Sequence, residues 1–309
     1  MGWLYRAIFP RWRPRAELRP TMSATSAARD GAVRIRWLGT AGHVIETATT
    51  TLLIDPFLSR PSLPRLAGRI APDEAAIRAR LPARVDAILC GHSHFDHLLD
   101  APFIARTTGA TLAGSDTTCM FARASGVAET QLVAVPPAGR TFTVGDATIR
   151  FVPSLHGRIA FGRVPFPGEV AAPPPLPART WHYRMGGAFG ILIETGGLRI
   201  YHNGSADLID AELDGARADV LLVGLAGRKG TRDYLKRLCD ALAPQLIVPT
   251  HHDAFFGPLD SDLRLLPGID LDGFVSDTRA HAPSATIVTP AYDEPLAVPA
   301  EARAAALVA

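Results

Sequence analysis

Cysteine is scarce in this chain of 309 residues. It occurs at three positions, Cys90, Cys119 and Cys239. An odd and sparse set does not build the disulfide framework of a small secreted domain, so the sequence favours a reducing compartment and a cytoplasmic location.

A strong charge of either sign is also missing. The 32 Lys and Arg residues nearly balance the 30 Asp and Glu residues, which leaves a net charge of +2. So small an excess is not typical of a nucleic-acid-binding surface, and we expect no nucleic-acid partner. No stretch approaches the roughly 18 consecutive apolar residues of a membrane-spanning helix, so an integral membrane protein is not expected either.

Turn-forming residues, by contrast, are plentiful. The chain contains 27 Gly and 26 Pro residues, which indicates many turns and argues against an all-helical bundle. Hydrophobic residues make up 47% and charged residues 20% of the chain, as in an ordinary globular protein.

The first 20 residues are basic and aromatic. Arg6 and Pro10 interrupt the apolar core of about 7–15 residues that a secretory signal needs. One interpretation is a disordered basic tail, with Met22 as an alternative start. The other is a segment that lies on an anionic membrane surface, which would make the protein membrane-peripheral. We favour the first and assign residues 1–32 to a tail.

Alternating or continuous apolar runs predict strands through most of the chain. They occupy residues 33–38, 51–54, 85–90, 110–114, 131–135, 141–145, 148–153, 189–195, 198–203, 218–226 and 244–250. Helices are expected over residues 73–80, 101–108, 116–125 and 231–242. Strands that come in runs early and alternate with helices later indicate one layered α/β domain over residues 33–290. The Ala-rich residues 291–309 carry no motif and are assigned to a C-terminal tail.

Residues 157–188 contain six prolines and show neither helical nor strand periodicity. A loop of this length in a compact domain is either functional or disordered. If it overhangs an active site, its aromatic side chains could line an apolar pocket and its basic side chains could meet an anion. These are Phe161, Phe166, Trp181 and Tyr183, and Arg158, Arg163, Arg179, His182 and Arg184. Arg228 and Lys229 follow a strand end and could face the same site, although their segment does not match a phosphate-binding loop.

Three histidines fall within six residues, in the segment Gly91-His92-Ser93-His94-Phe95-Asp96-His97 directly after a predicted strand. On such a loop His92 and His94 point the same way, and Asp96 and His97 can turn toward a second point nearby. Without a metal, these polar groups would be crowded at a buried strand end with no obvious partners. Imidazoles and carboxylates suit zinc, iron or manganese, so the segment predicts a metal centre.

Further ligands should come from other strand ends. His156 and His251 both follow predicted strands. His252 should point away from His251, which makes it a candidate for the rim of the site or for contact with a ligand. Asp55, also at a strand end, could hold a ligand histidine by hydrogen bonding; the alternative is a turn residue before Pro56.

These residues together resemble the metallo-β-lactamase superfamily. Residues 92–97 are similar to its signature, and Asp55, His156 and His251 stand in the expected order around it. The resemblance covers about residues 33–290. It implies a four-layer αββα sandwich with the metal ions at the edge of the two sheets.

Two further segments are most similar to one branch of this superfamily. They are GTAGH at residues 39–43 and PTHHDAFF at residues 249–256. The branch includes the ascorbate-phosphate lactonase and the phospholipase D that cleaves N-acyl-phosphatidylethanolamine.

The resemblance also implies which residues bind metal. The first ion would be held by His92, His94 and His156, and the second by Asp96, His97 and His251. Ser205 stands where the family usually has the aspartate that bridges the two ions. A hydroxyl is a poorer ligand than a carboxylate, so we expect a weaker second site or a single ion. Asp207 could substitute if the turn is reshaped.

The chemistry expected of this centre is hydrolysis. A metal ion held by three histidines lowers the pKa of a bound water molecule to about 7. Asp96 would orient the resulting hydroxide, and His251 could protonate the leaving group. We expect one or two zinc ions, with manganese or iron as alternatives. The substrate would be a small-molecule or lipid-like ester, lactone or phosphodiester.

Two other functions remain open from the sequence. One is a non-catalytic metal-binding module, in which Ser205 marks the decay of the second metal site. The other is a di-iron oxidoreductase, since some superfamily members bind two iron ions, usually with an added flavin domain.

Overall fold

Two seven-stranded sheets form the centre of the protein, in a computed structural model that describes residues 3–13, 15–19, 32–159 and 162–299. The first sheet, in spatial order, contains β16 (Pro295–Val298), β1 (Val33–Trp37), β2 (His43–Glu46), β3 (Thr51–Ile54), β5 (Ala87–Leu89), β6 (Thr111–Gly114) and β7 (Leu132–Ala134). The second contains β15 (Thr286–Ile287), β14 (Leu246–Thr250), β13 (Val220–Gly224), β12 (Leu198–Asn203), β11 (Ala188–Thr195), β9 (Ala147–Ser154) and β8 (Arg140–Val144). Strands β4 (Arg69–Ile70) and β10 (Ala178–Arg179) form a separate pair.

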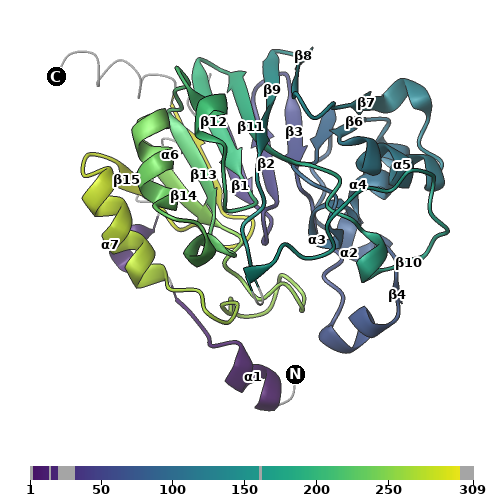
Figure 1. Ribbon diagram of the computed structural model, residues 1–309, viewed down its shortest axis with the longest axis horizontal. Helices are drawn as coiled ribbons and strands as arrows, with labels where there is room; N and C mark the ends of the chain where they lie inside the picture. Colours follow the sequence, from purple (N-terminus) through teal and green to yellow (C-terminus); the bar gives the residue numbers. More distant parts are fainter. Residues whose placement is uncertain (1–2, 14, 20–31, 160–161, 300–309) are drawn as a thin grey trace.

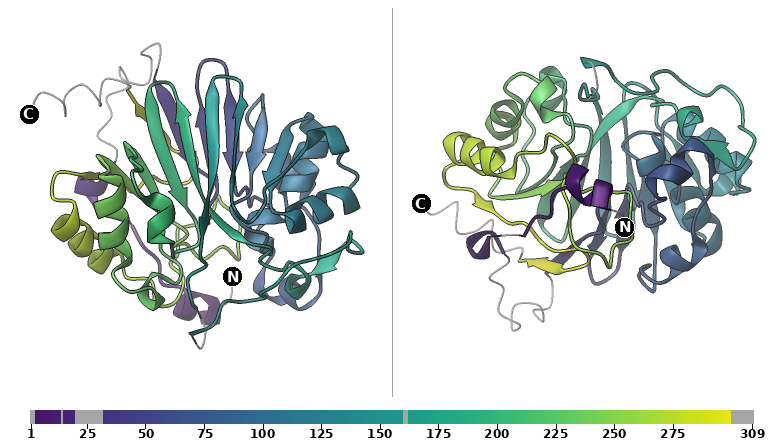
Figure 2. Two further views of the ribbon diagram at one scale, coloured as in Figure 1. Left: turned by 45° about the horizontal axis from the view of Figure 1, so that its top comes forward. Right: turned by 90° about the horizontal axis from the view of Figure 1, so that it is seen from below.

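Helices cover the outer face of each sheet (Figures 1 and 2). The α-helices are α1 (Trp3–Ile8), α2 (Glu74–Arg78), α3 (Phe95–Leu98), α4 (Ala101–Thr108), α5 (Asp116–Ala124), α6 (Tyr234–Leu242) and α7 (Leu271–His281). Short 3-10 helices are η1 (Ala16–Leu18), η3 (Leu63–Ala67), η4 (Glu129–Gln131), η6 (Thr180–His182), η7 (Asp210–Leu213) and η8 (Arg228–Gly230). Among these helices, none is both long and apolar enough to cross a membrane.

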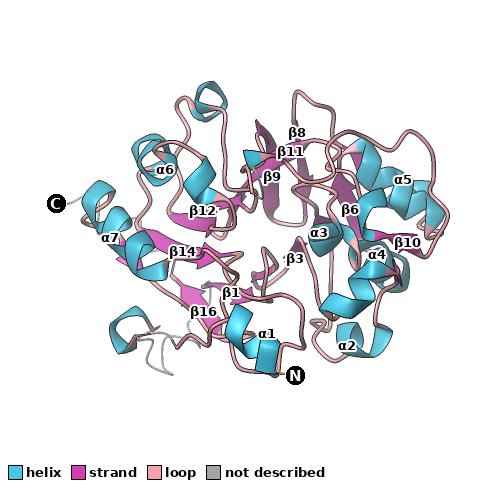
Figure 3. Cartoon of the chain, turned by 60° about the horizontal axis from the view of Figure 1, so that its bottom comes forward, coloured by secondary structure: helices cyan, strands magenta, loops and turns pink. Residues whose placement is uncertain are grey.

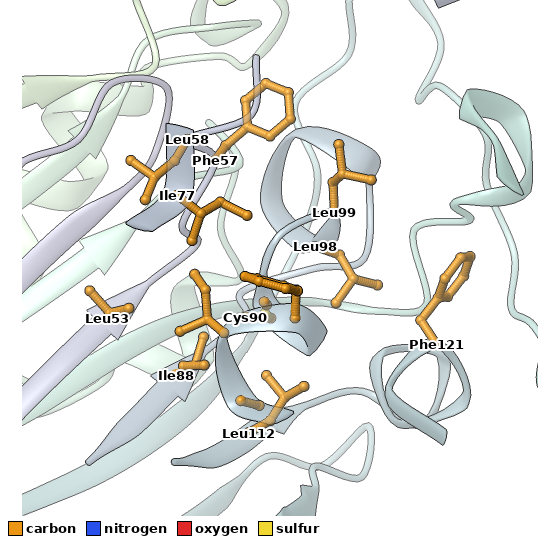
Figure 4. Close-up of a cluster of buried hydrophobic side chains, with 14 of the residues drawn as sticks. Leu53, Phe57, Leu58, Ile77, Ile88, Cys90, Leu98, Leu99, Leu112 and Phe121 are labelled. Carbon is orange, nitrogen blue, oxygen red and sulfur yellow. The ribbon is translucent and has the colours of Figure 1, made fainter. Parts of the chain in front are cut away.

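The layers are held together by three apolar cores. The innermost lies between the sheets and receives alternate residues of facing strands, such as Ile35 of β1 and Ile149 of β9. A second core lies between the first sheet and its helices. Figure 4 shows this core, where helix residues Ile77, Leu98 and Phe121 lie near strand residues Leu53, Ile88 and Leu112. A third core joins the second sheet to α6 and α7. This arrangement is the four-layer αββα sandwich that the sequence resemblance implied.

The topology brings several strand ends to one edge of the molecule. In the first sheet, β3, β5, β6 and β7 are parallel neighbours; in the second, β12, β13, β14 and β15 are. Loops that follow parallel strands emerge on the same side, which is where open α/β sheets bind ligands. In Figure 3, with that edge turned forward, α1 and α3 both lie on this side.

The assignment of residues 1–32 to a disordered tail is wrong for residues 3–13 and 15–19. Phe9 and Leu18 are buried, and the backbone of Trp12 donates to the carbonyl of Leu263 at 3.0 Å. The apolar residues between the arginines are the reason, because they pack on the rest of the chain. The remaining residues of the predicted tail up to 31 lie outside the described residues, and a membrane contact stays a prediction.

The predicted C-terminal tail also begins too early. Strand β16 pairs antiparallel with β1, with Val298 opposite Val33, and so completes the first sheet. Its apolar residues are buried because they cover the edge of β1. The domain therefore extends to about residue 298, and residues 300–309 lie outside the described residues.

Candidate metal centre

The predicted metal ligands converge at the edge where the strands end. His92 follows β5, His156 follows β9, and His251 follows β14, so both sheets contribute. His94, Asp96 and His97 belong to the turn that enters and forms α3. They form two groups that could each hold a metal ion, His92 with His94 and His156, and Asp96 with His97 and His251.

In the first group, the three imidazoles face one another closely. The ring centre of His92 lies 4.7 Å from that of His94 and 4.8 Å from that of His156, and the last two are 4.9 Å apart. All three ring pairs meet edge to face. Their ligating nitrogens all lie within 4.8 Å of one another, a spacing that a single ion can bridge.

Backbone carbonyls select the nitrogen that each ring offers. Nε2 of His94 donates to the carbonyl of Pro165 at 2.9 Å, and Nδ1 of His156 donates to the carbonyl of Gly157 at 2.7 Å. The opposite nitrogen, Nδ1 of His94 and Nε2 of His156, is thereby left unprotonated and able to bind a cation. Both carbonyls belong to the Pro-rich loop of residues 157–188. One function of this loop is therefore to orient the imidazoles of His94 and His156.

The second group is organised by Asp55. One carboxylate oxygen of Asp55 lies 2.8 Å from Nδ1 of His97, and the other accepts the backbone N–H of Gly91 at 2.7 Å. Nε2 of His97 is thus turned toward Asp96, whose carboxylate lies 3.7 Å away and 3.3 Å from Nε2 of His251. Asp55 therefore orients a candidate ligand, as the sequence predicted.

Burial keeps the first group in the state that binds metals. It depresses the pKa of His92 well below 6.5 and lowers the pKa of His94 to about 4 and that of His156 to about 3. Burial raises the pKa of Asp96, but the adjacent His97 and His251 outweigh it, so this pKa lies below the ordinary value. At neutral pH the first group thus presents neutral imidazoles, and Asp96 of the second group is an ionised carboxylate.

The donor set fits a metal ion. Nε2 of His92 and Nε2 of His97 are buried and have no hydrogen-bond partner among the described residues. Leaving such groups uncompensated costs about 1–3 kcal/mol each. Two groups of nitrogen and carboxylate donors aimed at common points would be compensated by zinc or a similar cation.

Ser205 and Asp207 lie outside both groups. The hydroxyl of Ser205 donates to the carbonyl of Leu155 at 3.0 Å, so it fastens the turn to the loop before His156. Asp207 accepts the N–H of Leu208 at 2.8 Å and lies 3.7 Å from Arg237. The structure therefore does not bring Asp207 to the position where it could replace a bridging ligand.

His252 points away from the centre, as expected from its place next to His251. It does not reach the rim of the site, however, because it is buried and stacks on Trp37 at 4.6 Å between ring centres. The His252 side chain therefore packs in the interior and does not contact the side chain of a candidate metal ligand.

A buried network that the sequence did not reveal holds the loop that carries His251. The carboxylate of Asp253 accepts the N–H of Thr40 at 2.8 Å and the hydroxyl of Tyr292 at 2.9 Å, and it pairs with Arg60 at 2.8 Å. The carbonyl of Thr40 in turn accepts the N–H of His251 at 2.7 Å. Both Thr40 and His251 have φ of 51°, a conformation that persists only where the surroundings impose it. In the sequence, the feature that could have indicated this network is the place of Asp253 two residues after His251, in the segment PTHHD.

The predicted pocket aromatics and cations divide between the site and other regions. A cavity of about 840 Å³ lies against the metal centre and is lined in part by Arg158, Phe166, Arg228 and Lys229. Tyr183 instead stacks on Phe121 in the outer core. The remaining predicted residues, Arg163, Arg179, Trp181, His182 and Arg184, do not line this cavity, and Phe161 lies outside the described residues.

Comparison with known proteins agrees with this geometry. The family model described as the beta-lactamase superfamily domain matches residues 34–251. A UPF0173 metal-dependent hydrolase of Anaeromyxobacter dehalogenans is 30% identical over 243 residues, which cover 75% of this chain and 79% of the relative. Another, from Carboxydothermus hydrogenoformans, is 29% identical over 231 residues, 72% of this chain and 86% of the relative.

The solved structures show the same fold. Igni18, a metallo hydrolase from the archaeon Ignicoccus hospitalis, matches with a TM-score of 0.56 and 18% identity over 86% of this chain and 97% of its own. At that identity the likeness concerns the fold alone. From the family model and the curated relatives it follows that the chain belongs to the β-lactamase superfamily and, within it, to the UPF0173 metal-dependent hydrolases.

Proposed function

We propose that this metal-dependent hydrolase cleaves an ester, lactone or phosphodiester bond in a small-molecule or lipid-like substrate, with zinc as its metal. The observation that carries the proposal is that His94, Asp96, His156 and His251 belong to the two ligand groups and also line the large cavity. A substrate bound in that cavity would have its reacting bond directly beside the metal positions.

The residues of the centre suit hydrolysis. A bound zinc ion would supply a water molecule of lowered pKa and an electrophile for the carbonyl or phosphoryl oxygen. Asp96, held ionised by His97 and His251, can accept a hydrogen bond from the attacking water and orient it. If only the first ion is bound, Nε2 of His251, which lies 3.3 Å from the Asp96 carboxylate, carries no metal and can donate a proton to the leaving oxygen.

Within the superfamily, we propose kinship with the branch of the ascorbate-phosphate lactonase and the N-acyl-phosphatidylethanolamine phospholipase D. The support comes from two short segments of the chain and their contact with each other. The two segments most similar to that branch, residues 39–43 and 249–256, are joined by the bonds from Thr40 to His251 and Asp253. They act as one structural unit behind the second ligand group.

Metal content and turnover together test the proposal. The zinc-loaded protein is expected to hydrolyse at least one of p-nitrophenyl acetate, an aryl lactone and bis(p-nitrophenyl) phosphate. His94→Ala should lower kcat/KM at least about 100-fold because it removes a ligand beside the substrate. Asp207→Asn is the matched control, since Asp207 lies outside both groups, and it should leave the rate unchanged.

Other outcomes would favour the alternatives. Bound metal with no turnover of any substrate would support a non-catalytic metal-binding module. Bound iron with a redox signal, and again no hydrolysis, would support an oxidoreductase.

A further inference from the structure

The cavity beside the metal centre is mostly apolar. Ile159, Phe166, Leu225, Phe255, Phe256 and Leu266 are among its lining residues. Ile159 and Phe166 remain 44% and 36% exposed, so large apolar side chains face the open part of the cavity. A volume of about 840 Å³ is within the range of small-ligand sites and accommodates an acyl or aryl group.

Phe166 is fixed in place above the candidate ligand His94. Its carbonyl accepts the N–H of Met185 at 2.9 Å, and its ring meets that of His94 edge to face at 6.3 Å. The apolar wall therefore continues to the metal centre, so an apolar group beside the reacting bond would lose its contact with water there.

The charged side chains of the cavity are mainly cationic. Arg158, Arg228 and Lys229 line it. Arg228 is already paired, with Asp277 at 2.9 Å and the carbonyl of Asp270 at 3.2 Å. Arg158 and Lys229 are exposed, and within the described residues neither has a carboxylate within ion-pair distance.

The acidic residues of the lining do not offset these two cations. Asp96 belongs to the second ligand group. Asp270 caps α7, where its carboxylate accepts the N–H of Gly273 at 2.8 Å. Arg158 and Lys229 are therefore the charged lining groups without a role in the fold or in metal binding, and they favour an anion in the cavity.

The two cations extend from loops that touch. A Cβ atom on Gly230 would lie 2.6 Å from the carbonyl oxygen of Arg158, and one on Gly227 would lie 3.1 Å from Ile159. The close backbone approach requires glycine at position 230, and at position 227 a φ of 91° favours glycine. Arg158 and Lys229 thus belong to touching loops of the cavity lining, and Arg158 lies two residues after the candidate ligand His156.

We propose that the site takes an anionic amphiphile, with its apolar group in the cavity and its carboxylate or phosphate group held by Arg158 and Lys229. This inference rests on the proposed hydrolytic function and names its substrate class. The anion is a recognition group separate from the bond that is cleaved.

Matched pairs of esters test the charge preference. Mono(p-nitrophenyl) suberate and p-nitrophenyl octanoate have acyl chains of equal length, but only the first carries a terminal carboxylate; the adipate and hexanoate esters form a shorter pair. With the zinc-loaded protein, the anionic member of a pair should have a KM at least about 10-fold lower than the neutral one, as expected for a charge-assisted contact.

The double variant Arg158→Gln/Lys229→Gln should remove this difference. It should raise the KM of the anionic ester about 10-fold, with little change in kcat, and leave the neutral ester unaffected. Arg163→Gln is the matched control, because Arg163 lies in the same loop but does not line the cavity, and it should change neither ester. Equal KM values in the wild type, or an equal effect of the double variant on both esters, would overturn the inference.

A binding experiment separates this inference from the proposed function. If no ester is hydrolysed, the proposed function fails, and calorimetry with octyl phosphate and inorganic phosphate decides the ligand class. Octyl phosphate that binds more tightly than inorganic phosphate, and about 10-fold more weakly to the double variant, supports the anionic amphiphile. Equal binding of the two phosphates, or no effect of the double variant, overturns it.

Discussion

At the scale of single residues, Asp55 lies outside both candidate ligand groups but contacts the segment that carries them. Its two carboxylate oxygens serve different partners, Nδ1 of His97 and the N–H of Gly91. The contact with His97 orients a candidate ligand of the second group. The contact with Gly91 positions the loop that carries His92 and His94 of the first group. Partners of this kind typically contribute a factor of about 10–100 in metal affinity.

Asp55→Asn should therefore weaken the second group selectively. The variant keeps an oxygen for Gly91 but sets an amide N–H₂ against His97, so we expect the affinity for the second zinc ion to fall about 10–100-fold. Titration with zinc against a chromophoric chelator measures both binding steps. Asp207→Asn serves as the control and should retain both. A similar loss at both steps, or at neither, would contradict this role of Asp55.

At the scale of elements, the N-terminal helix α1 is anchored by the apolar residue that directly follows it. Phe9, the residue after the helix, is 4% exposed and lies 5.6 Å from Phe256 between ring centres, whereas Ile8, the last residue of the helix, is 45% exposed. Phe256 lines the cavity, so this segment supports the wall of the candidate site from behind.

Phe9→Ala should lower the free energy of unfolding by about 3 kcal/mol, because it removes a buried ring and leaves a cavity. Ile8→Ala, one position away on the exposed side, should change it by less than about 0.5 kcal/mol. Urea unfolding followed by circular dichroism measures both. Equal effects of the two substitutions would show that this segment does not pack as described.

The elements differ in how well the sequence reveals them. Strands such as β13 and β14 are continuous apolar runs between turns, and this pattern is sufficient to predict them. Strand β2 is missed because its four residues adjoin the glycines of the preceding turn. Strand β16 is missed because its place depends on β1, at the other end of the domain.

The same distinction applies to the site. His92, His156 and His251 are predictable because each follows an apolar strand, and strand ends meet at one edge. Arg60 and Tyr292 are not predictable, because they reach Asp253 only through tertiary contacts. Sequence patterns thus identify the candidate ligands, whereas the groups that hold them in place require the structure.

At the scale of the whole molecule, the space between the sheets contains a buried histidine pair as well as apolar residues. His43 of β2 and His202 of β12 meet edge to face at 5.4 Å between ring centres, and both bond the carbonyl of Ala41, at 3.0 and 2.9 Å. Burial, followed by the neighbouring His202, depresses the pKa of His43 well below 6.5. The protein therefore keeps His43 neutral at a pH where the unfolded chain would protonate it.

This difference makes the fold sensitive to acid. The unfolded chain binds a proton at His43 near pH 6.5 and the folded protein does not, so stability rises with pH in this window and is lost as the pH falls below about 6.5. His43→Gln cannot titrate, and its free energy of unfolding should fall less steeply between about pH 6.5 and pH 4.5, by about 1–2 kcal/mol over that interval. Urea unfolding at a series of pH values, with a chelator present so that metal binding does not contribute, measures the slope. Near pH 8 the variant should be no more stable than the wild type, because the imidazole is neutral there. Parallel curves for the two proteins would mean that His43 binds its proton equally in both states, and that the acid sensitivity of the fold arises elsewhere.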